Sequence, residues 1–309
     1  MNGANSTSVR APRRSTAAPI TSSERSEIEM KRIDLHIHTT ASDGTATPEE
    51  VVREASRLGL AAIAITDHDT AGGYVRAAAE AEKTGLEVVP GIEISTKYGG
   101  PVHILGYYID VASPALQEVL DWIVHDRDER NAKMCALMRA DGIDITYEQM
   151  RERFGEVIGR PHFAEILVEL GIASDMKDAF ARFVEKGQKY YQGRKFLTIE
   201  RSIELIRAAG GTAVLAHPFQ YHLSAESLRA LIEHCIDSGL EGIECRYSGY
   251  TEERSAYLES LAGEYGLIKT GGSDFHGTNK PEIRIGDGMG GLNVPYDFLE
   301  TLKAHRAHS

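Results

Sequence analysis

Two histidines with a single residue between them, His36 and His38, lie close to a carboxylate, Asp43, within the segment KRIDLHIHTTASD at residues 31–43. The first part of this segment predicts a short strand, and alternate residues of a strand point to the same face. We therefore expect the two imidazoles to project side by side, with the carboxylate just past the strand end. Neutral imidazole and carboxylate are ligand types that hold hydrolytic divalent metals. Alternating strand histidines are also found as surface polar residues, so this pair alone leaves both interpretations open.

Further histidines and acids follow the other strand candidates of the chain. They are His68, Glu93, His103, His217, Asp274 and His276. In a parallel α/β architecture, ligands bind at the carboxyl ends of the strands. A hydrogen-bonded core histidine is an ordinary explanation for any single one of these residues. A scatter of surface histidines would not place the whole set at strand ends, so the set as a whole predicts a metal site.

The strands are predicted from apolar runs that alternate with helical patterns. Together with the strand at the first histidine pair, the runs at 60–65, 86–95, 102–108, 211–217, 240–245 and 267–272 give seven candidates. The helix after the first strand has a clear start, because Thr47 is a capping residue, Pro48 fits the first helical position and Glu50 completes a capping box. Apolar strands alternating with helices favour a parallel α/β sheet or barrel.

The alternation breaks in residues 111–197, which contain no good strand candidate. Leu116, Leu120 and Ile123 lie on one helical stripe, and shorter helical patterns follow at 147–154, 161–170 and 174–184. We therefore expect an α/β barrel domain formed by residues 30–110 and 198–309, interrupted by an all-helical insertion at 111–197.

Residues 1–29 differ in composition from the rest, being rich in Ser, Thr, Ala and Pro with three arginines and no apolar core segment. A secretory signal needs such an apolar segment, so we expect a disordered tail instead. Met30 stands directly before the first strand and is an alternative start of translation. A basic arm for nucleic acid is a weaker interpretation, because so few arginines are present.

Composition narrows the class of protein. The net charge of −12 does not suit electrostatic tracking along nucleic acid, although a metal cluster would create a local positive site. No apolar run approaches the roughly 20 residues that span a bilayer, so no membrane interaction is expected. The three cysteines form no CxxC pair, which favours a reducing, cytoplasmic compartment. No obligate protein partner is indicated.

The ordered set of motifs resembles the PHP (polymerase and histidinol phosphatase) family of metallohydrolases. The matching segments are HIH at 36–38, TDHD at 66–69, GIE at 91–93, His103, AHP at 216–218 and SDFH at 273–276. The helical insertion further resembles the bacterial subgroup of 3′,5′-nucleoside bisphosphate phosphatases and the 5′-to-3′ exoribonuclease RNase AM. The family resemblance implies a distorted seven-stranded β/α barrel, in agreement with the strand count.

The resemblance also implies three divalent metal ions, typically Mn, Zn or Fe. The first ion would be held by His36, His38, Glu93 and Asp274, the second by Glu93, His103 and His217, and the third by Asp43, His68 and His276. Three such ions with three carboxylates leave a site of about +3, which attracts phosphate and lowers the pKa of bound water. The expected catalytic group is a metal-bridging hydroxide held by the first ligand set, without a protein nucleophile.

Substrate contacts are expected from the helical insertion. Within GRPH at 159–162, Arg160 suits a phosphate oxygen, and the subgroup resemblance points to the same motif, including His162. A solvated arginine beside a helix cap is the alternative for Arg160. Arg130 and Arg194 are weaker candidates. For Arg130, together with Arg127 and Asn131, ordinary surface charge is an equal explanation.

Three further interpretations remain open. Arg194, with Lys189, Lys195 and the aromatic residues between them, forms either a basic and aromatic lip that stacks a base or ordinary packing. Asp67 and Asp69 either orient metal-bound histidines or cap the following helix. Glu244 ends the sixth strand and would face the site, but no motif supports a role for it.

The leading functional hypothesis is a phosphoesterase that acts on nucleotides or on short 5′-phosphorylated RNA. It would remove the 3′-phosphate of a 3′,5′-bisphosphate nucleotide, or cleave nucleotides from a 5′-phosphorylated end. One alternative is a small-molecule phosphatase of the histidinol-phosphate type. An alternative from another class is a noncatalytic, metal-binding regulatory domain.

Overall fold

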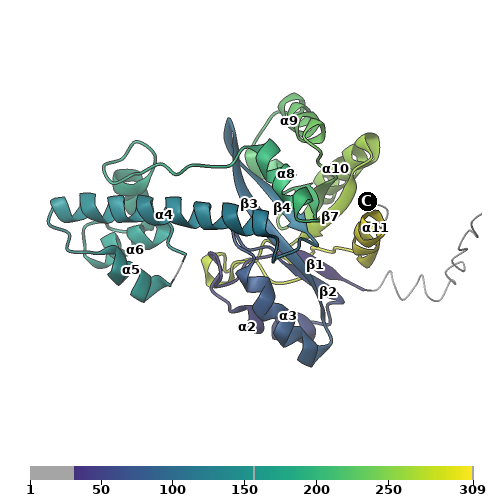
Figure 1. Ribbon diagram of the computed structural model, residues 1–309, viewed down its shortest axis with the longest axis horizontal. Helices are drawn as coiled ribbons and strands as arrows, with labels where there is room; N and C mark the ends of the chain where they lie inside the picture. The colour runs from purple at the N-terminus through teal and green to yellow at the C-terminus, as the bar shows by residue number, and fades with distance from the viewer. Residues whose placement is uncertain (1–30, 156, 308–309) are drawn as a thin grey trace, which may run out of the picture.

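In the computed structural model, the described residues are 31–155 and 157–307. Within them the chain forms a seven-stranded sheet whose strands follow one another in sequence order (Figure 1). The strands are β1 (Ile33–Ile37), β2 (Ala62–Ile65), β3 (Glu87–Tyr98), β4 (Gly100–Tyr107), β5 (Thr212–Leu215), β6 (Gly242–Tyr247) and β7 (Ile268–Gly272). The expected tail at 1–29 and Met30 lie outside the described residues.

The sheet closes on itself through contacts between β1 and the end of β7. The Asp274 N–H donates to the His36 carbonyl at 2.8 Å, and the His38 N–H donates to the Phe275 carbonyl at 3.0 Å. The approach is so close that a Cβ at Gly272 would lie 2.3 Å from the backbone nitrogen of His36. These contacts give the distorted seven-stranded α/β barrel that the sequence predicts.

One strand departs from the parallel arrangement that alternation with helices favours. β4 runs antiparallel to both β3 and β5, whereas the other paired strands are parallel. The reason is local, because a tight turn at Gly99, which has φ of +68°, joins β3 directly to β4. A short turn of this kind permits only antiparallel pairing. The reversal places His103, in the first half of β4, opposite Ser95 near the far end of β3.

Helices cover the outside of the barrel. They are α2 (Pro48–Arg57), α3 (Gly72–Thr84), α8 (Ile199–Ala208), α9 (Ala225–Asp237), α10 (Glu252–Tyr265) and α11 (Tyr296–Arg306), with short 3₁₀ turns η2 (Pro218–Tyr221) and η3 (Gly277–Asn279). The start predicted for α2 is confirmed, because Thr47 and Glu50 form the reciprocal hydrogen bonds of a capping box.

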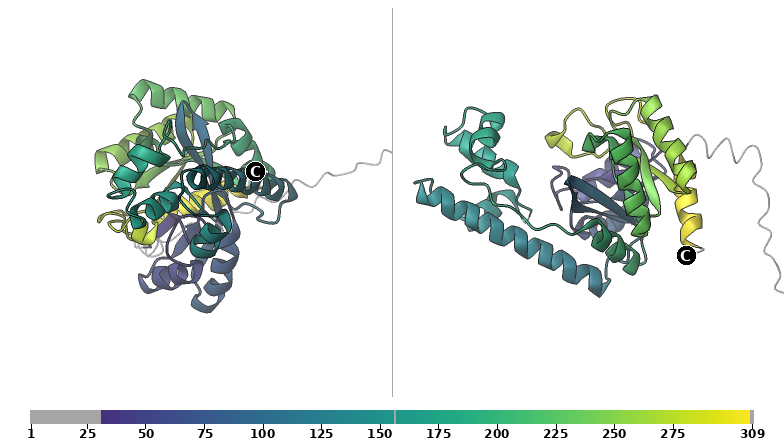
Figure 2. Two further views of the ribbon diagram at one scale, coloured as in Figure 1. Left: turned by 90° about the vertical axis from the view of Figure 1, so that its left-hand side faces the viewer. Right: turned by 90° about the horizontal axis from the view of Figure 1, so that it is seen from above.

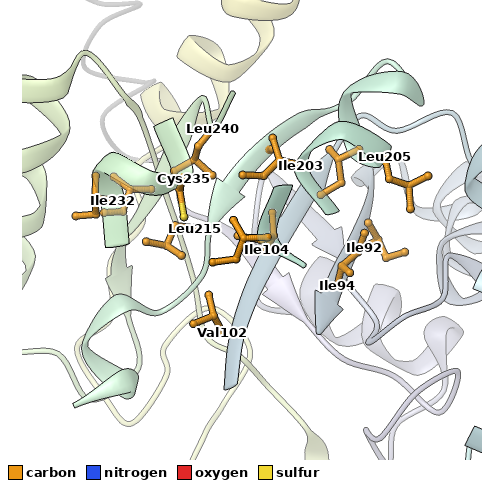
Figure 3. Close-up of a cluster of buried hydrophobic side chains, with 14 of the residues drawn as sticks. Ile92, Ile94, Val102, Ile104, Ile203, Leu205, Leu215, Ile232, Cys235 and Leu240 are labelled. Atoms are coloured by element: carbon orange, nitrogen blue, oxygen red, sulfur yellow. The ribbon is translucent and has the colours of Figure 1, made fainter. Parts of the chain in front are cut away.

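The largest hydrophobic cluster lies between the outer face of the sheet and helices α8, α9 and α10 (Figure 3). Ile104 and Leu215 project from neighbouring strands toward Ile203 and Ile232, and all four side chains have no exposed area. Burial of apolar surface contributes about 25 cal/mol per Å² to stability, and it is the main force that keeps these helices packed on the sheet.

The chain between β4 and α8 forms α4 (Pro114–Ala140), α5 (Tyr147–Phe154), α6 (Arg160–Glu169), α7 (Met176–Ala179) and the π-helical turn η1 (Phe180–Val184). We refer to residues 111–197 as the helical segment. Figures 1 and 2 show that its helices project to one side of the barrel. A separate hydrophobic cluster, which includes Met134, Phe163 and Tyr190, lies within this segment.

Helix α4 belongs to two hydrophobic clusters. Leu116, Leu120 and Ile123 near its beginning pack into the barrel cluster, and Met134 and Met138 near its end pack into the cluster of the helical segment. Although α4 has 27 residues, no helix of the described chain is long and apolar enough to cross a membrane.

Candidate functional site

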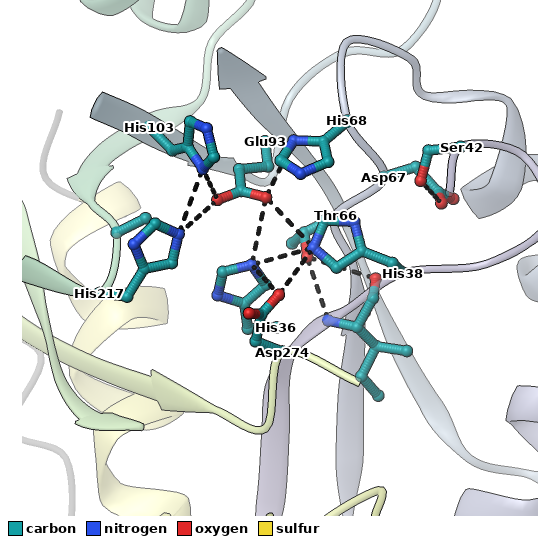
Figure 4. Close-up of polar contacts among 12 residues, drawn as sticks. His36, His38, Ser42, Thr66, Asp67, His68, Glu93, His103, His217 and Asp274 are labelled. Carbon is teal, nitrogen blue, oxygen red and sulfur yellow. Dashed lines mark hydrogen bonds and ion pairs between the residues drawn. The ribbon is translucent and has the colours of Figure 1, made fainter. Parts of the chain in front are cut away.

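All nine side chains proposed as metal ligands converge at one end of the barrel, and most of them are visible in Figure 4. Glu93, in the middle of β3, is fully buried and lies at the centre. Its Oε1 lies 2.9 Å from both His103 Nδ1 and His217 Nε2. Its Oε2 lies 3.1 Å from His38 Nε2 and from His68 Nδ1, and 3.4 Å from His36 Nε2.

Asp274 completes the first predicted ligand set. Its Oδ1 lies 3.2 Å from His38 Nε2 and 3.5 Å from His36 Nε2. His36, His38, Glu93 and Asp274 thus direct one atom each at a common point. The second predicted set is also compact, since the facing nitrogens of His103 and His217 are 3.2 Å apart beside Glu93 Oε1.

The third predicted set, Asp43, His68 and His276, lies toward the open side of the site. Asp43 Oδ1 is 3.3 Å from His276 Nε2, and Asp43 Oδ2 is 4.0 Å from His68 Nε2. His38 joins this group through its other nitrogen, because Nδ1 lies 3.5 Å from Asp43 Oδ1. The sequence did not indicate this double position of His38 between two sets.

Several buried atoms of the cluster show that the arrangement suits cations. His38 Nδ1, His68 Nδ1, His217 Nδ1 and Glu93 Oε2 are buried and make no hydrogen bond. Buried polar atoms without partners are rare and costly in folded proteins. In addition, His36 Nε2 and His38 Nε2 face each other at 3.2 Å. A divalent ion would satisfy these atoms, since neutral imidazole and carboxylate are its common ligands.

The electrostatics of the cluster also favour positive charge. Burial alone would lower the pKa of His38, but the carboxylates of Asp274, Glu93 and Asp43 around it raise that pKa to about 10. Burial would raise the pKa of Glu93, yet the facing histidines, above all His68 and His103, hold it well below its usual range. The carboxylates therefore stay ionised and attract protons or metal ions.

The pKa of His68, unlike that of His38, is lowered. Its burial lowers its pKa to about 4, because the charges of Glu93 and Asp43 do not compensate the loss of solvent. A neutral imidazole with a free lone pair is the form that binds a metal.

Three non-glycine residues of the site adopt backbone conformations with positive φ. They are Asp69 at 55°, His217 at 23° and Asp274 at 56°. Such conformations cost about 1–3 kcal/mol each and collect at functional sites, where the surrounding structure holds them in place. They lie in the segments that follow β2, β5 and β7.

Two side chains that the sequence left without a defined role support the cluster. Glu244 on β6 is fully buried, and its Oε1 lies 3.0 Å from His36 Nδ1. Tyr247 donates a hydrogen bond of 2.6 Å to Asp274 Oδ2, which also accepts one from the Lys280 ammonium at 2.6 Å. The only sequence signal for Glu244 was its position at the end of the sixth predicted strand, and Tyr247 was not indicated by the sequence.

Asp67 and Asp69 fill neither of the roles considered for them. Asp67 accepts hydrogen bonds from the Thr39 N–H, the Thr39 hydroxyl and the Ser42 hydroxyl, and it therefore holds the loop that carries Asp43 (Figure 4). Asp69 accepts from the Ser95 N–H and pairs with Arg194. Both carboxylates thus stabilise loops around the cluster.

A cavity of about 680 Å³ adjoins the cluster between the barrel rim and the helical segment. His68, His103 and His276 line it from the barrel, while Phe180 and Tyr191 line it from the helical segment. Four arginines also line it: Arg127, Arg130, Arg160 and Arg194. In a protein of net charge −12, these arginines make one wall of the cavity strongly basic.

Arg127 and Arg130 are not surface charges, so that interpretation was wrong. Their exposed fractions are 7% and 8%, and Asn131 is fully buried. Arg130 donates hydrogen bonds to Asn131 Oδ1 and to the Ile158 carbonyl. Arg127 Nε is buried without a hydrogen-bond partner. Burial, together with the nearby charge of Arg194, lowers the pKa of Arg130 to about 10.

Arg160 and His162 lie at the start of α6 beside the cavity. Within the described chain, Arg160 forms no ion pair, and its guanidinium lies 5.9 Å from the Phe180 ring centre and 5.7 Å from that of Tyr191. His162 Nδ1 accepts a hydrogen bond from the Gly159 N–H, so this ring caps the helix as well as lining the cavity. Arg194 lies over the Phe196 ring at 4.4 Å.

The predicted basic and aromatic lip is only partly placed at the cavity. Tyr191, Arg194 and Phe196 line it. Tyr190 instead packs inside the helical segment, where its ring stacks on Phe183 at 5.8 Å. Its hydroxyl donates a hydrogen bond to Asp141 at 2.6 Å, and Lys189 also pairs with that carboxylate.

A β/α barrel with a buried cluster of histidines and carboxylates at one rim defines a metal-dependent hydrolase class. Residues 34–237 match the model of the PHP domain, and the chain belongs to the PHP domain family. The motif-based recognition is thereby confirmed.

Known relatives agree with the recognised subgroup. The chain is 37% identical over 247 residues to the 5′-3′ exoribonuclease Rnm of Salmonella typhimurium, covering 79% of this chain and 84% of the relative. It is 36% identical over 250 residues to the 3′,5′-nucleoside bisphosphate phosphatase of Chromobacterium violaceum, covering 80% and 88%. A solved structure from Bifidobacterium adolescentis, described as a metal-dependent phosphoesterase, is 32% identical with a TM-score of 0.72, covering 89% and 96%.

Proposed function

We propose that this protein is a divalent-metal-dependent phosphoesterase that hydrolyses phosphate esters of nucleotides or of short 5′-phosphorylated RNA. The observation that carries the proposal is the position of the arginine-lined cavity directly beside the histidine and carboxylate cluster. The relatives in this subgroup are named for the same two reactions, at 36% and 37% identity.

The cluster would hold up to three metal ions of the Mn, Zn or Fe type. His36, His38, Glu93 and Asp274 would hold the first ion, Glu93 with His103 and His217 the second, and Asp43 with His68 and His276 the third. Such ions supply an activated water and positive charge to stabilise a phosphoryl transition state. The buried carboxylates of Glu93 and Asp274 keep His36 of β1 and His38, directly after β1, aligned on a common point.

The arginines would recognise a second phosphate of the same substrate. Guanidinium groups bind phosphate through paired hydrogen bonds, and the guanidinium of Arg160, which forms no ion pair within the described chain, supplies donors to the cavity that Arg127 also lines. A substrate with one ester at the metal cluster and a 5′-phosphate at the arginines meets both requirements. The rings of Phe180 and Tyr191 offer an apolar surface for the nucleoside between them.

The volume of the cavity suits a small substrate. About 680 Å³ lies within the range of roughly 300–1,000 Å³ that holds small ligands. We further propose that the helical segment is an insertion domain that covers the metal site and determines specificity. Its own hydrophobic cluster and its contribution of Arg127, Arg130 and Arg160 to the cavity wall support this assignment.

A side-by-side turnover assay with added Mn²⁺ tests the function. The substrates are adenosine 3′,5′-bisphosphate, a 5′-phosphorylated oligoribonucleotide and histidinol phosphate, each measured by release of phosphate or mononucleotide. We expect turnover of at least one of the first two and little of the third. Preference for histidinol phosphate would support the small-molecule alternative. No turnover of any substrate, by protein shown to contain metal, would support a noncatalytic metal-binding domain.

A matched pair of histidine variants ties the activity to the cluster. His36→Ala removes a buried ligand candidate and is expected to abolish turnover while the fold survives. His125→Ala is the control, because His125 is exposed on α4 and pairs with Glu129 away from the cavity. Activity of His36→Ala close to that of the control would place the active site elsewhere.

A further inference from the structure

Glu244 is a buried carboxylate whose two oxygens have partners in different ligand sets. It lies on β6 with no exposed area. Oε1 lies 3.0 Å from His36 Nδ1, and Oε2 accepts a hydrogen bond of 2.7 Å from the backbone N–H of His217. We propose that Glu244 is a positioning residue that fixes the tautomer of His36 and the backbone of His217, and so couples two of the proposed metal sites. This inference rests on the proposed metal centre.

The tautomer of His36 follows from the chemistry of its partner. An ionised carboxylate can only accept hydrogen bonds, so the proton of a neutral His36 ring must be on Nδ1. Nε2 then carries the lone pair, and this is the atom that faces Glu93 and Asp274. A carboxylate behind a ligating histidine fixes ring orientation and raises its basicity. Glu244 thus prepares His36 to bind through Nε2.

The second oxygen acts on the backbone rather than on a ring. His217 has a strained φ of 23°, and its N–H bond to Glu244 helps to hold this conformation. The conformation in turn places His217 Nε2 at 2.9 Å from Glu93. Directly after Glu244, the pairing of β6 with β7 shifts register before Arg246. Irregularities of this kind re-aim side chains near active sites.

An isosteric amide cannot replace this carboxylate. Glutamine offers one acceptor and one donor group where both partners of Glu244 are donors. If its oxygen faced the His217 N–H, its NH₂ group would face His36 Nδ1 and require the proton of the ring to move to Nε2. If its oxygen faced His36, its NH₂ group would oppose the N–H of His217. Glu244→Gln therefore disturbs one of the two sets in either orientation.

The test compares wild type, Glu244→Gln and Glu241→Gln by Zn²⁺ binding in competition with a chelator. Glu241 is the matched control, because it also bonds to one backbone N–H, of Ala213, and to one histidine ring, of His305, outside the ligand set. We expect Glu244→Gln to weaken zinc binding about 10- to 100-fold, and Glu241→Gln to bind zinc as wild type does. Wild-type affinity in Glu244→Gln, or an equal loss in both variants, would overturn the proposal.

A spectroscopic measurement on wild type decides the matter even if Glu244→Gln does not fold. In the Zn²⁺-loaded protein labelled with ¹⁵N-histidine, His36 is expected to show an Nδ1–H proton protected from exchange with solvent. In a folded Glu244→Gln variant, this signal is expected to shift or to exchange rapidly. Zinc bound through Nδ1 of His36 in wild type would refute the assignment of Glu244. Failure of wild type to bind zinc at all would refute the metal centre itself, which separates the two outcomes.

Discussion

Arg160→Met tests whether the metal cluster hydrolyses the ester while the arginines of the cavity wall bind a second phosphate. Methionine keeps an unbranched apolar side chain against the Phe180 and Tyr191 rings, but it removes the charge and all five hydrogen-bond donors. Because Arg160 forms no ion pair within the described chain, its removal leaves no carboxylate without a partner. The variant is therefore expected to fold with nearly unchanged stability.

The size of the effect follows from the contacts that a bound phosphate would lose. A hydrogen bond to a charged group contributes about 1.5–3 kcal/mol. Since about 1.4 kcal/mol corresponds to a factor of ten, kcat/KM for a nucleotide with a 5′-phosphate should fall roughly 10- to 100-fold. An aryl phosphate has no second phosphate to bind, so only the metal cluster would stabilise its transition state. Its kcat/KM should therefore change less than about twofold.

The assay needs a control arginine in the same segment. Arg153→Met serves this purpose, since Arg153 on α5 pairs with Glu165 and Glu169 on the surface and lies over the Phe154 ring at 4.7 Å. Exposed ion pairs contribute about 0–1 kcal/mol, so this variant should keep full activity on both substrates. An equal loss on the nucleotide and the aryl phosphate for Arg160→Met would refute the anchoring role, as would no loss on either.

Two further measurements address the metal site and the closure of the barrel. At pH 8, metal binding should release protons, because His38 has a pKa of about 10 in the metal-free protein and must become neutral to bind a metal ion. For the same reason, the affinity for the metal ion should rise as the pH increases toward 10. Calorimetry in buffers of different ionisation enthalpy measures this release, and a value of zero would contradict the electrostatics. Gly272→Ala should lower the free energy of unfolding by about 1–3 kcal/mol, since its Cβ would collide with His36, whereas Gly263→Ala in α10 meets open space and should not. Equal melting temperatures for the two alanine variants would argue against the close approach of β7 to β1.

The strands and the nine ligand candidates could be predicted because both depend on short segments. A buried strand needs a run of apolar residues, and the residues directly after it are those that reach the rim. His103 shows the limit of this reasoning, because it lies near the start of its strand and joins the cluster only through the antiparallel turn of β3 and β4.

The supporting residues escaped prediction for a different physical reason. Glu244 was expected to face the site, but no motif gave it a role. The direction of Tyr247 depends on a register shift that follows Glu244 in β6, and such a shift results from pairing with β7 rather than from the local sequence. Arg127 and Arg130 resembled surface charge because α4 is polar along much of its length. The carbonyl of Ile158, which lies beyond α5 in the chain, accepts hydrogen bonds from Arg130 and Asn131. Contacts between segments distant in the chain decide these positions.

Helix α4 also sets the distance between the barrel and the core of the helical segment. One stripe of it, through Leu120, Arg127 and Met134, faces in turn the barrel cluster, the cavity and the cluster of the helical segment. A helix advances about 1.5 Å and turns about 100° with each residue. The number of residues in α4 therefore sets the span along the helix between the barrel cluster and the cluster of the helical segment. Removing seven residues would keep the stripe aligned but shorten that span by about 10 Å, whereas removing two would turn the arginines away from the substrate.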